Sequence, residues 1–161
     1  MFIITILNKK DIRMKTKIHK VASIIATITV ATFFISTVIV ELFGTQEMIV
    51  LVKGLIVMPG IVILTLAMAL TGATGFALAK DRKGRVVEAK KRRMPIIAIT
   101  GIFILIPAAI YLSNWASAGI FDSKFYTLQA IELIAGASNL TLMIKSIKDG
   151  KKLTSKKKSK G

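Results

Sequence analysis

Long uncharged blocks dominate the pattern of apolar and polar residues along this chain. Residues 21–40, 54–79 and 94–121 carry no charged side chain, and residues 125–144 carry only Glu132. About 20 predominantly apolar residues in a helix cross the hydrocarbon core of a bilayer. The blocks lack the alternation over about ten residues that marks a membrane β-strand. The pattern therefore predicts an all-α fold, a four-transmembrane-helix bundle with up-down-up-down topology.

The flanking segments set the expected domain boundaries. We expect helices over about 21–43, 48–79, 94–117 and 124–145, after a basic N-terminal segment of residues 1–20. Residues 146–161 are basic without apolar periodicity, which predicts a disordered tail that lies against anionic lipid headgroups. The first block is too long for the apolar region of a signal peptide. The short apolar stretch before it is either an interfacial anchor or lies upstream of a translation start at Met14.

The charge distribution predicts the orientation of the bundle. The chain has 24 Lys and Arg residues against 8 acidic ones, a net charge of +16. All but Lys53 and Lys124 fall before the first helix, between the second and third, or after the fourth. An excess of Lys and Arg marks cytoplasmic loops, so both termini are expected in the cytoplasm. We interpret the charge as topological and as attraction to lipid, not as nucleic-acid binding.

Aromatic side chains and helix-breaking residues support this arrangement. Six aromatic residues fall near the expected outer interface, where aromatic belts form: Phe43, Tyr111, Trp115, Phe121, Phe125 and Tyr126. Small residues recur on helices two and three, including Ala67, Thr71, Gly75 and Ala79, and predict close helix contacts. Pro59 and Pro107 are expected to kink their helices, whereas Pro95 is placed near a first turn that tolerates it.

A polar stripe on the fourth helix carries the main candidate site. Gln129, Glu132, Gly136, Asn139 and Met143 follow a spacing of alternately three and four residues, which puts them on one helical face. An unpaired carboxylate in lipid is costly, so this face must point into the bundle or toward another subunit. Lys53 and Glu41 enter from the same side and are the possible ion-pair partners in this region, and a Lys53–Glu132 pair is geometrically possible. A structural polar network and an ion or proton site both remain open, and we favour the network.

Candidates for cofactor and metal chemistry are few. There is no cysteine, which excludes disulfides, iron–sulfur clusters and cysteine-based zinc sites. His19 is the single histidine, at the cytoplasmic end of the first helix, and it could serve as one axial ligand of haem b. Ligation by two histidines of this chain is impossible, and an interfacial histidine among lysines is the favoured interpretation. We therefore expect no metal and no resident cofactor, with haem b as the alternative.

Several segments resemble known membrane proteins. ATFFISTVIVELFG, KRRMPIIAITGIFILIPAAIYL and FDSKFYTLQAIELIAGASNLTLM together look like a group of small four-helix bacterial inner-membrane proteins of unassigned activity. The resemblance covers most of residues 19–150 and implies the four-helix topology and a location in the bacterial inner membrane, with both termini in the cytoplasm. A histidine that opens the first helix and the Thr71–Gly72 pair late in the second are also weakly similar to b-type-cytochrome-like membrane anchors, which implies haem binding at His19.

Three classes of function follow from these features. The favoured one is a non-catalytic accessory or anchor subunit of a larger, respiratory membrane complex, with other membrane subunits as partners. The second is a small transporter or channel subunit that works through Glu132. The third is a membrane enzyme for lipophilic substrates, with Arg92, Arg93, Tyr111 and Asn114 as candidates. These four residues are expected on opposite sides of the membrane, so we predict that the chain is not an enzyme.

Overall fold

The computed structural model describes residues 2–79 and 84–158, and within these residues every element is helical. Two short π-helical turns, η1 and η2, interrupt longer α-helices. In chain order the elements are α1 (Phe2–Phe43), α2 (Gln46–Leu55), η1 (Ile56–Gly60), α3 (Ile61–Ala79), α4 (Arg85–Thr100), η2 (Gly101–Leu105), α5 (Ile106–Ser117) and α6 (Ser123–Lys158).

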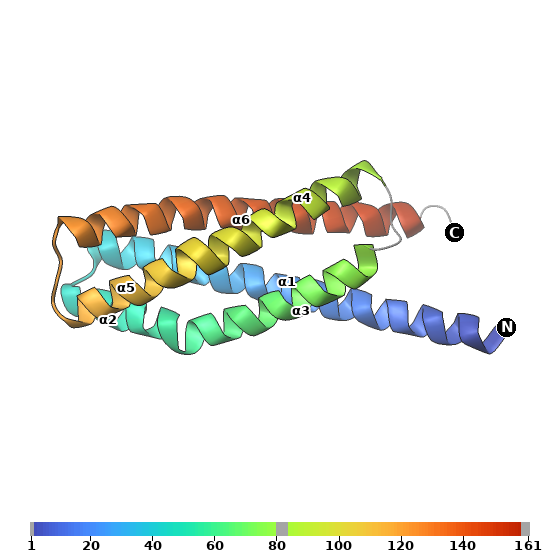
Figure 1. Cartoon of the computed structure of the whole chain (residues 1–161), viewed down its shortest axis with the longest axis horizontal. Coiled ribbons are helices and arrows are strands. Elements are labelled where there is room, and N and C mark those ends of the chain that lie inside the picture. The colour runs from blue at the N-terminus through green and yellow to red at the C-terminus, as the bar shows by residue number, and fades with distance from the viewer. Residues whose placement is uncertain (1, 80–83, 159–161) are drawn as a thin grey trace.

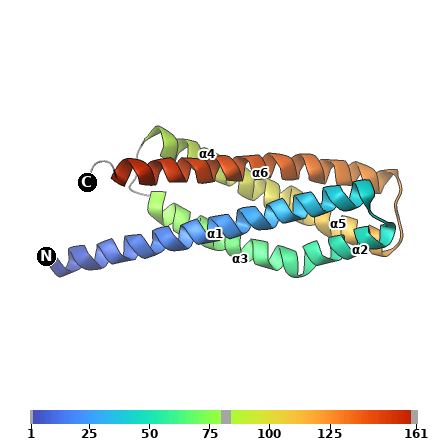
Figure 2. The ribbon, with the colours of Figure 1, turned by 180° about the vertical axis from the view of Figure 1, so that it is seen from behind.

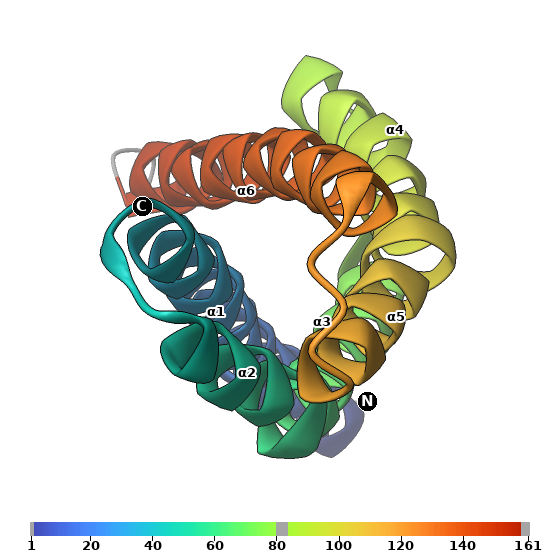
Figure 3. The same cartoon turned by 90° about the vertical axis from the view of Figure 1, so that its left-hand side faces the viewer.

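These elements form four rods in an up-down-up-down bundle (Figure 1). The rods are α1, α2 with α3, α4 with α5, and α6, and each contains a segment long and apolar enough to cross a membrane: Lys10–Phe43, Gln46–Ala79, Val87–Ser117 and Ser123–Lys152. Seen end-on, α1 lies beside α2 and α6, and α5 closes the ring between α2 and α6 (Figure 3). The predicted four-helix all-α fold is confirmed, and the chain is a multi-pass membrane protein.

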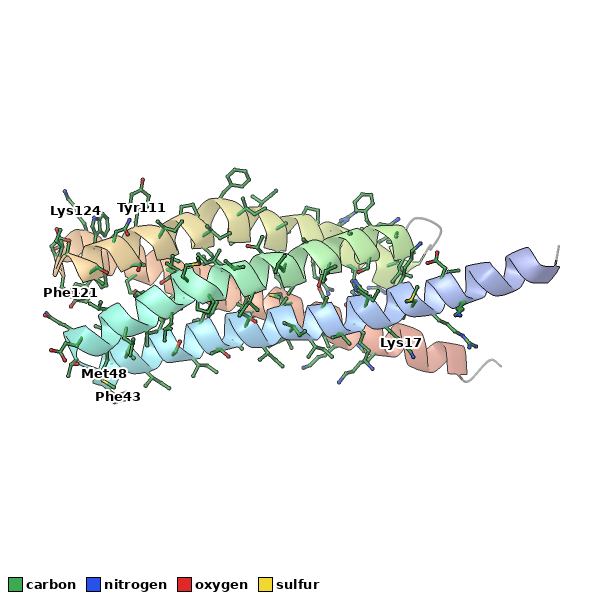
Figure 4. The ribbon with its side chains drawn as sticks, turned by 90° about the horizontal axis from the view of Figure 1, so that it is seen from below. Lys17, Phe43, Met48, Tyr111, Phe121 and Lys124 are labelled. Carbon is green, nitrogen blue, oxygen red and sulfur yellow. The ribbon has the colours of Figure 1, made fainter. Side chains whose placement is uncertain are left out.

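The two ends of the bundle differ in chemistry. The start of α1, the end of α3, the start of α4 and the end of α6 lie together at one end, here called the basic end (Figure 2). The opposite end, here called the aromatic end, carries the α1–α2 and α5–α6 connections. Labelled side chains separate accordingly, with Lys17 toward the basic end and Phe43, Met48, Tyr111, Phe121 and Lys124 at the aromatic end (Figure 4).

Three helices extend beyond the expected limits. The described helix α1 begins at Phe2, not near residue 21, and α4 begins at Arg85, not near residue 94. Helix α6 continues to Lys158, so residues 146–158 are helical where the sequence predicted a disordered tail, and residues 159–161 lie outside the described part. Lysine has a favourable helix propensity, so a charged stretch can extend a helix into water once the membrane segment has nucleated it. Pro95 consequently lies inside α4 and not in its first turn.

The interior is built from small and branched side chains in two layers. Ala26, Val30, Ala67, Ile97 and Met143 pack together toward the basic end. A second cluster toward the aromatic end joins all four rods: Val40, Ile49, Leu112, Ala116 and Phe125. Lipid supplies no hydrophobic drive for helix association, so small residues that allow close packing carry much of the attraction.

Two of the three prolines lie at the breaks in helical regularity. Pro59 lies within η1, where Met58 leaves the helical region with φ −138° and ψ 119°. Pro107 is in the first turn of α5, directly after η2. A proline ring clashes with the carbonyl four residues earlier and lacks an N–H, so a regular α-helix cannot continue unchanged through either residue. At η1 the chain is kinked at Met58, next to Pro59, as expected, whereas at η2 a π turn directly precedes Pro107.

The η1 turn allows a close contact between the first two rods. A Cβ added to Gly60 would lie 2.5 Å from Cζ of Phe33 and 2.9 Å from the carbonyl oxygen of Leu55. No other side chain fits at residue 60 without displacement of the Phe33 ring on α1.

We predict that Gly60→Ala destabilises the bundle by about 1–3 kcal/mol, the usual cost of overpacking. Unfolding in detergent, followed by circular dichroism, measures the change. Gly54→Ala is the matched control, because a Cβ at Gly54 meets nothing within 4 Å. Adding Phe33→Ala to Gly60→Ala should recover part of the lost stability, and equal stability of the Gly54 and Gly60 variants would contradict the close contact.

Candidate functional site

Polar side chains from α1, α2 and α6 occupy the half of the bundle near the aromatic end. Lys53 lies seven residues into α2 and Glu132 nine residues into α6, which places them about 10 and 14 Å from that end at 1.5 Å per residue. Glu41 lies two residues before the end of α1, about 3 Å from the end. We call Glu41, Lys53, Gln129 and Glu132 the polar cluster.

An ion pair joins α2 to α6 in this cluster. The ammonium of Lys53 donates a hydrogen bond to Oε2 of Glu132 at 2.6 Å. The Lys53 side chain is 0% exposed and that of Glu132 is 13% exposed. A buried charge is tolerated only with a partner, and the two residues neutralise each other across the helix interface. The structure thus contains the Lys53–Glu132 pair, which the sequence indicated as geometrically possible.

The rest of the α6 stripe also faces the bundle. The amide of Gln129 donates to Oε2 of Glu132 at 3.1 Å, so this one oxygen accepts from both Lys53 and Gln129. Asn139 lies further toward the basic end, and its Nδ2 donates to the carbonyl oxygen of Ile97 on α4 at 3.4 Å. Gln129 and Asn139 are each 4% exposed. The stripe is therefore an internal feature of this chain and contacts α2 and α4.

Glu41 belongs to the cluster without an ion pair to Lys53. Its Oε1 is buried and has no hydrogen-bond partner within the described residues. Oε1 of Gln129 is also buried without a hydrogen-bond partner within the described residues. The structure pairs Lys53 with Glu132, and within the described residues Glu41 has no ion pair.

His19 forms a second interhelical contact, far from the polar cluster. Its Nδ1 lies 3.1 Å from the carbonyl oxygen of Thr71 and 3.2 Å from the hydroxyl oxygen of Thr74, both on α3. Since a carbonyl can only accept, Nδ1 carries the proton and donates to Thr71. Gly75 leaves room for the ring, because a Cβ there would lie 3.0 Å from its Cε1. His19 thus ties α1 to α3.

At the basic end the structure contains an ion pair that sequence reasoning missed. Arg93 on α4 donates to Oδ2 of Asp149 on α6 at 2.7 Å, with both side chains about one-fifth exposed. The available signal was that Asp149 is the single acid after Glu132 in a strongly basic segment. The pair holds α6 against α4 beyond the predicted end of the fourth helix.

The remaining candidate residues do not converge. Arg92 and Arg93 lie at the basic end, whereas Tyr111 and Asn114 lie in α5 toward the aromatic end. Within residues 2–79 and 84–158, no three His, Asp or Glu side chains are placed to hold a metal ion. The polar cluster is therefore the best candidate site in the described part of the chain.

We predict that Glu132→Leu destabilises the protein by about 3 kcal/mol or more, because it leaves the Lys53 ammonium buried without a counter-charge. Glu132→Gln keeps a hydrogen-bond acceptor and should cost less, about 1–2 kcal/mol, near the upper range for polar contacts between membrane helices. Replacing both partners in Lys53→Met with Glu132→Leu should restore most of the stability, since no charge remains buried.

Glu47→Leu is the matched control for these variants. Glu47 is an exposed acid in the first turn of α2 at the same end of the bundle, and its loss should change stability by less than about 0.5 kcal/mol. Unfolding in detergent measures all four proteins. A double variant as unstable as Glu132→Leu would show that the charge pair is not what holds α2 to α6.

Comparison of the chain with protein-family models, with curated proteins and with solved structures finds no match in any of the three. The resemblances to small inner-membrane proteins and to cytochrome-like anchors therefore stay predictions. The function has to be inferred from the geometry of this chain.

Proposed function

We propose that the protein is a non-catalytic accessory or anchor subunit of a larger membrane complex. The observation that carries this proposal is the Lys53–Glu132 ion pair. In this pair the two oppositely charged side chains of the apolar segments neutralise each other. Groups that could have reacted with a substrate are instead bonded across helix interfaces. The polar contacts of His19, Asn139 and Arg93 follow the same principle.

The outer surface of the bundle suits packing against other membrane helices. Large apolar side chains point outward, with Phe76 84%, Phe103 72% and Ile134 70% exposed. They come from α3, η2 and α6, so apolar surface is offered on several sides of the bundle. Large aromatic side chains of this kind frequently dominate the energy of protein interfaces. A helix of a partner subunit can pack against this surface in place of lipid.

The proposal includes a location and an orientation. We place the chain in a bacterial inner membrane. The density of Lys and Arg at the basic end supports an orientation with this end, and both termini, on the cytoplasmic side. In this orientation the basic segments lie next to anionic headgroups, each Lys or Arg adding about 1 kcal/mol of attraction near the surface. A respiratory complex is the proposed host because the cytochrome-like resemblance points there.

The proposed role is tested by the size of the native assembly. Membranes solubilised in mild detergent should yield the chain in a complex larger than the chain alone, resolved by native electrophoresis after crosslinking. Phe76→Ala and Phe103→Ala should leave unfolding unchanged, and at least one of them should lower recovery of the complex about fivefold, equal to about 1 kcal/mol. A chain that migrates alone after crosslinking in intact membranes would contradict the role.

The same preparation discriminates the two alternatives. Ion flux in reconstituted vesicles that disappears in a fully folded Glu132→Gln variant would favour a transporter or channel subunit. A Soret absorbance band that disappears in His19→Ala would favour haem b at His19.

The orientation is tested by cysteine labelling, for which the cysteine-free chain is a ready background. Lys124→Cys and Lys91→Cys are matched variants, because both lysines are exposed and lie at opposite ends of the bundle. An impermeant maleimide added outside intact cells should label residue 124 and leave residue 91 unlabelled until the cells are opened. The reverse labelling would invert the proposed topology.

A further inference from the structure

An open groove lies between α5 and α6 near the aromatic end of the bundle. Its volume is about 410 Å³, within the range of about 300–1,000 Å³ that is common for small-molecule sites. Its lining combines apolar side chains with a few polar ones near the start of α6: Trp115, Ser123, Lys124, Thr127, Leu128 and Ile131. None of these residues belongs to the polar cluster, so the groove is a separate feature of the chain.

The groove follows one face of α6 from the headgroup level into the hydrocarbon layer. Lys124 is the second residue of α6, and Ile131 lies about 10 Å further along the helix at 1.5 Å per residue. Residues 125–144 carry no charged side chain except Glu132, so the hydrocarbon layer begins next to Lys124. The polar start of the groove thus lies at the depth of lipid phosphates, and Leu128 and Ile131 lie at the depth of acyl chains.

Hydrogen-bond donors line the groove without an acceptor among the described residues. They are the indole N–H of Trp115, the hydroxyl of Ser123 and the ammonium of Lys124. The Thr127 hydroxyl, in contrast, donates to the carbonyl oxygen of Ser123 at 2.7 Å. Ser123 and Lys124 are exposed, and the Lys124 side chain extends outward at the aromatic end (Figure 4). Donors that include one cation fit a ligand with negatively charged oxygen atoms.

The neighbouring acid does not neutralise Lys124. Asp122 caps α6, because its Oδ1 accepts from the backbone N–H groups of Lys124 and Phe125 at 3.0 Å each. Its negative charge therefore lies against the positive end of the α6 dipole. Within the described part of the chain, no ion pair involves the Lys124 ammonium. This charge is thus available to a ligand.

The Trp115 wall of the groove is held in place by its neighbours. Its ring centroid lies 6.1 Å from that of Tyr111, one turn earlier on α5. On its other side Trp115 packs against the buried cluster near the aromatic end. Tryptophan and tyrosine favour the membrane–water interface, because each has an apolar ring and one polar group. The groove is therefore preformed at the depth where a lipid headgroup meets its acyl chains.

We propose that this groove is a binding site for a phospholipid of the surrounding bilayer. The phosphate lies at Trp115, Ser123 and Lys124, where its oxygen atoms accept from all the unpartnered donors. One acyl chain lies along Leu128 and Ile131. An apolar helix of a partner protein would cover the same donors without supplying acceptors, which is unfavourable. The site lies opposite the basic end, holds for either orientation of the chain and does not depend on the accessory role.

Trp115 provides the test, because it is the single tryptophan of the chain and bromine atoms on a lipid chain quench tryptophan fluorescence only at short range. The full-length protein in detergent is titrated with phosphatidylglycerol that carries dibrominated acyl chains. A diacylglycerol with the same brominated chains and no phosphate is titrated in parallel. We expect saturable quenching by the phospholipid, half complete at an about fivefold lower lipid fraction than with the diacylglycerol, equal to about 1 kcal/mol for one lysine beside the phosphate.

Variants of exposed residues connect the quenching to the groove. Lys124→Gln should raise the half-quenching fraction of the phospholipid about fivefold, whereas Lys91→Gln, at an exposed lysine of the basic end, should leave it unchanged. Ile131 is 48% exposed, so Ile131→Phe should narrow the groove and remove the saturable part while circular dichroism stays unchanged. Equal quenching by the two lipids, or no effect of Lys124→Gln, would overturn the proposal.

Crosslinking in native membranes identifies the occupant. A photoreactive phenylalanine analogue at residue 131 should give an adduct with the mass of a phospholipid. An adduct with another polypeptide would overturn the proposal, because the groove would then be a protein interface. Protection of Trp115 from quenching by glycerol phosphate, which lacks acyl chains, would also overturn it, because the site would then take a soluble phosphate.

Discussion

The constraint on which the bundle depends is the lysine ammonium inside its apolar interior. Lys53 is fully buried, and its charge can be kept there only if an acid lies within contact distance. Glu132 supplies that acid from α6 at 2.6 Å. This requirement sets the relative depth of the second and fourth rods, because a shift by one helical turn, about 5.4 Å, would separate the two charges.

Other polar contacts between side chains and backbone or side-chain groups of neighbouring rods hold the remaining rods together. Polar contacts occur at several levels of the bundle, and each joins two rods and satisfies a group that lipid would leave unpaired. Toward the basic end, His19 ties α1 to α3, and Arg93 with Asp149 ties α4 to α6. Between these contacts lie the layers of small and branched residues, which allow close approach. Polar contacts determine register, and apolar contacts supply packing.

The π turns adapt the two middle rods to this framework. Pro59 and Pro107 cannot continue regular α-helices without a clash, and η1 contains Pro59 whereas η2 directly precedes Pro107. At η1 the backbone comes so close to Phe33 that only glycine fits at residue 60. Near η2, Asn139 of α6 reaches the carbonyl oxygen of Ile97 on the adjacent rod. The breaks in regularity thus coincide with close contacts between rods.

The sequence by itself determined the number, order and membrane character of the helices, because about 20 apolar residues without charge have few other stable states. It also placed Gln129, Glu132 and Asn139 on one face, since helical periodicity depends on local geometry alone. Only the tertiary structure decided that Lys53 pairs with Glu132 and not with Glu41, because both acids are near Lys53 in depth and the choice depends on rod rotation. The Arg93–Asp149 pair between the extensions of α4 and α6 was likewise decided by a contact between segments distant in the chain, which composition and periodicity do not encode.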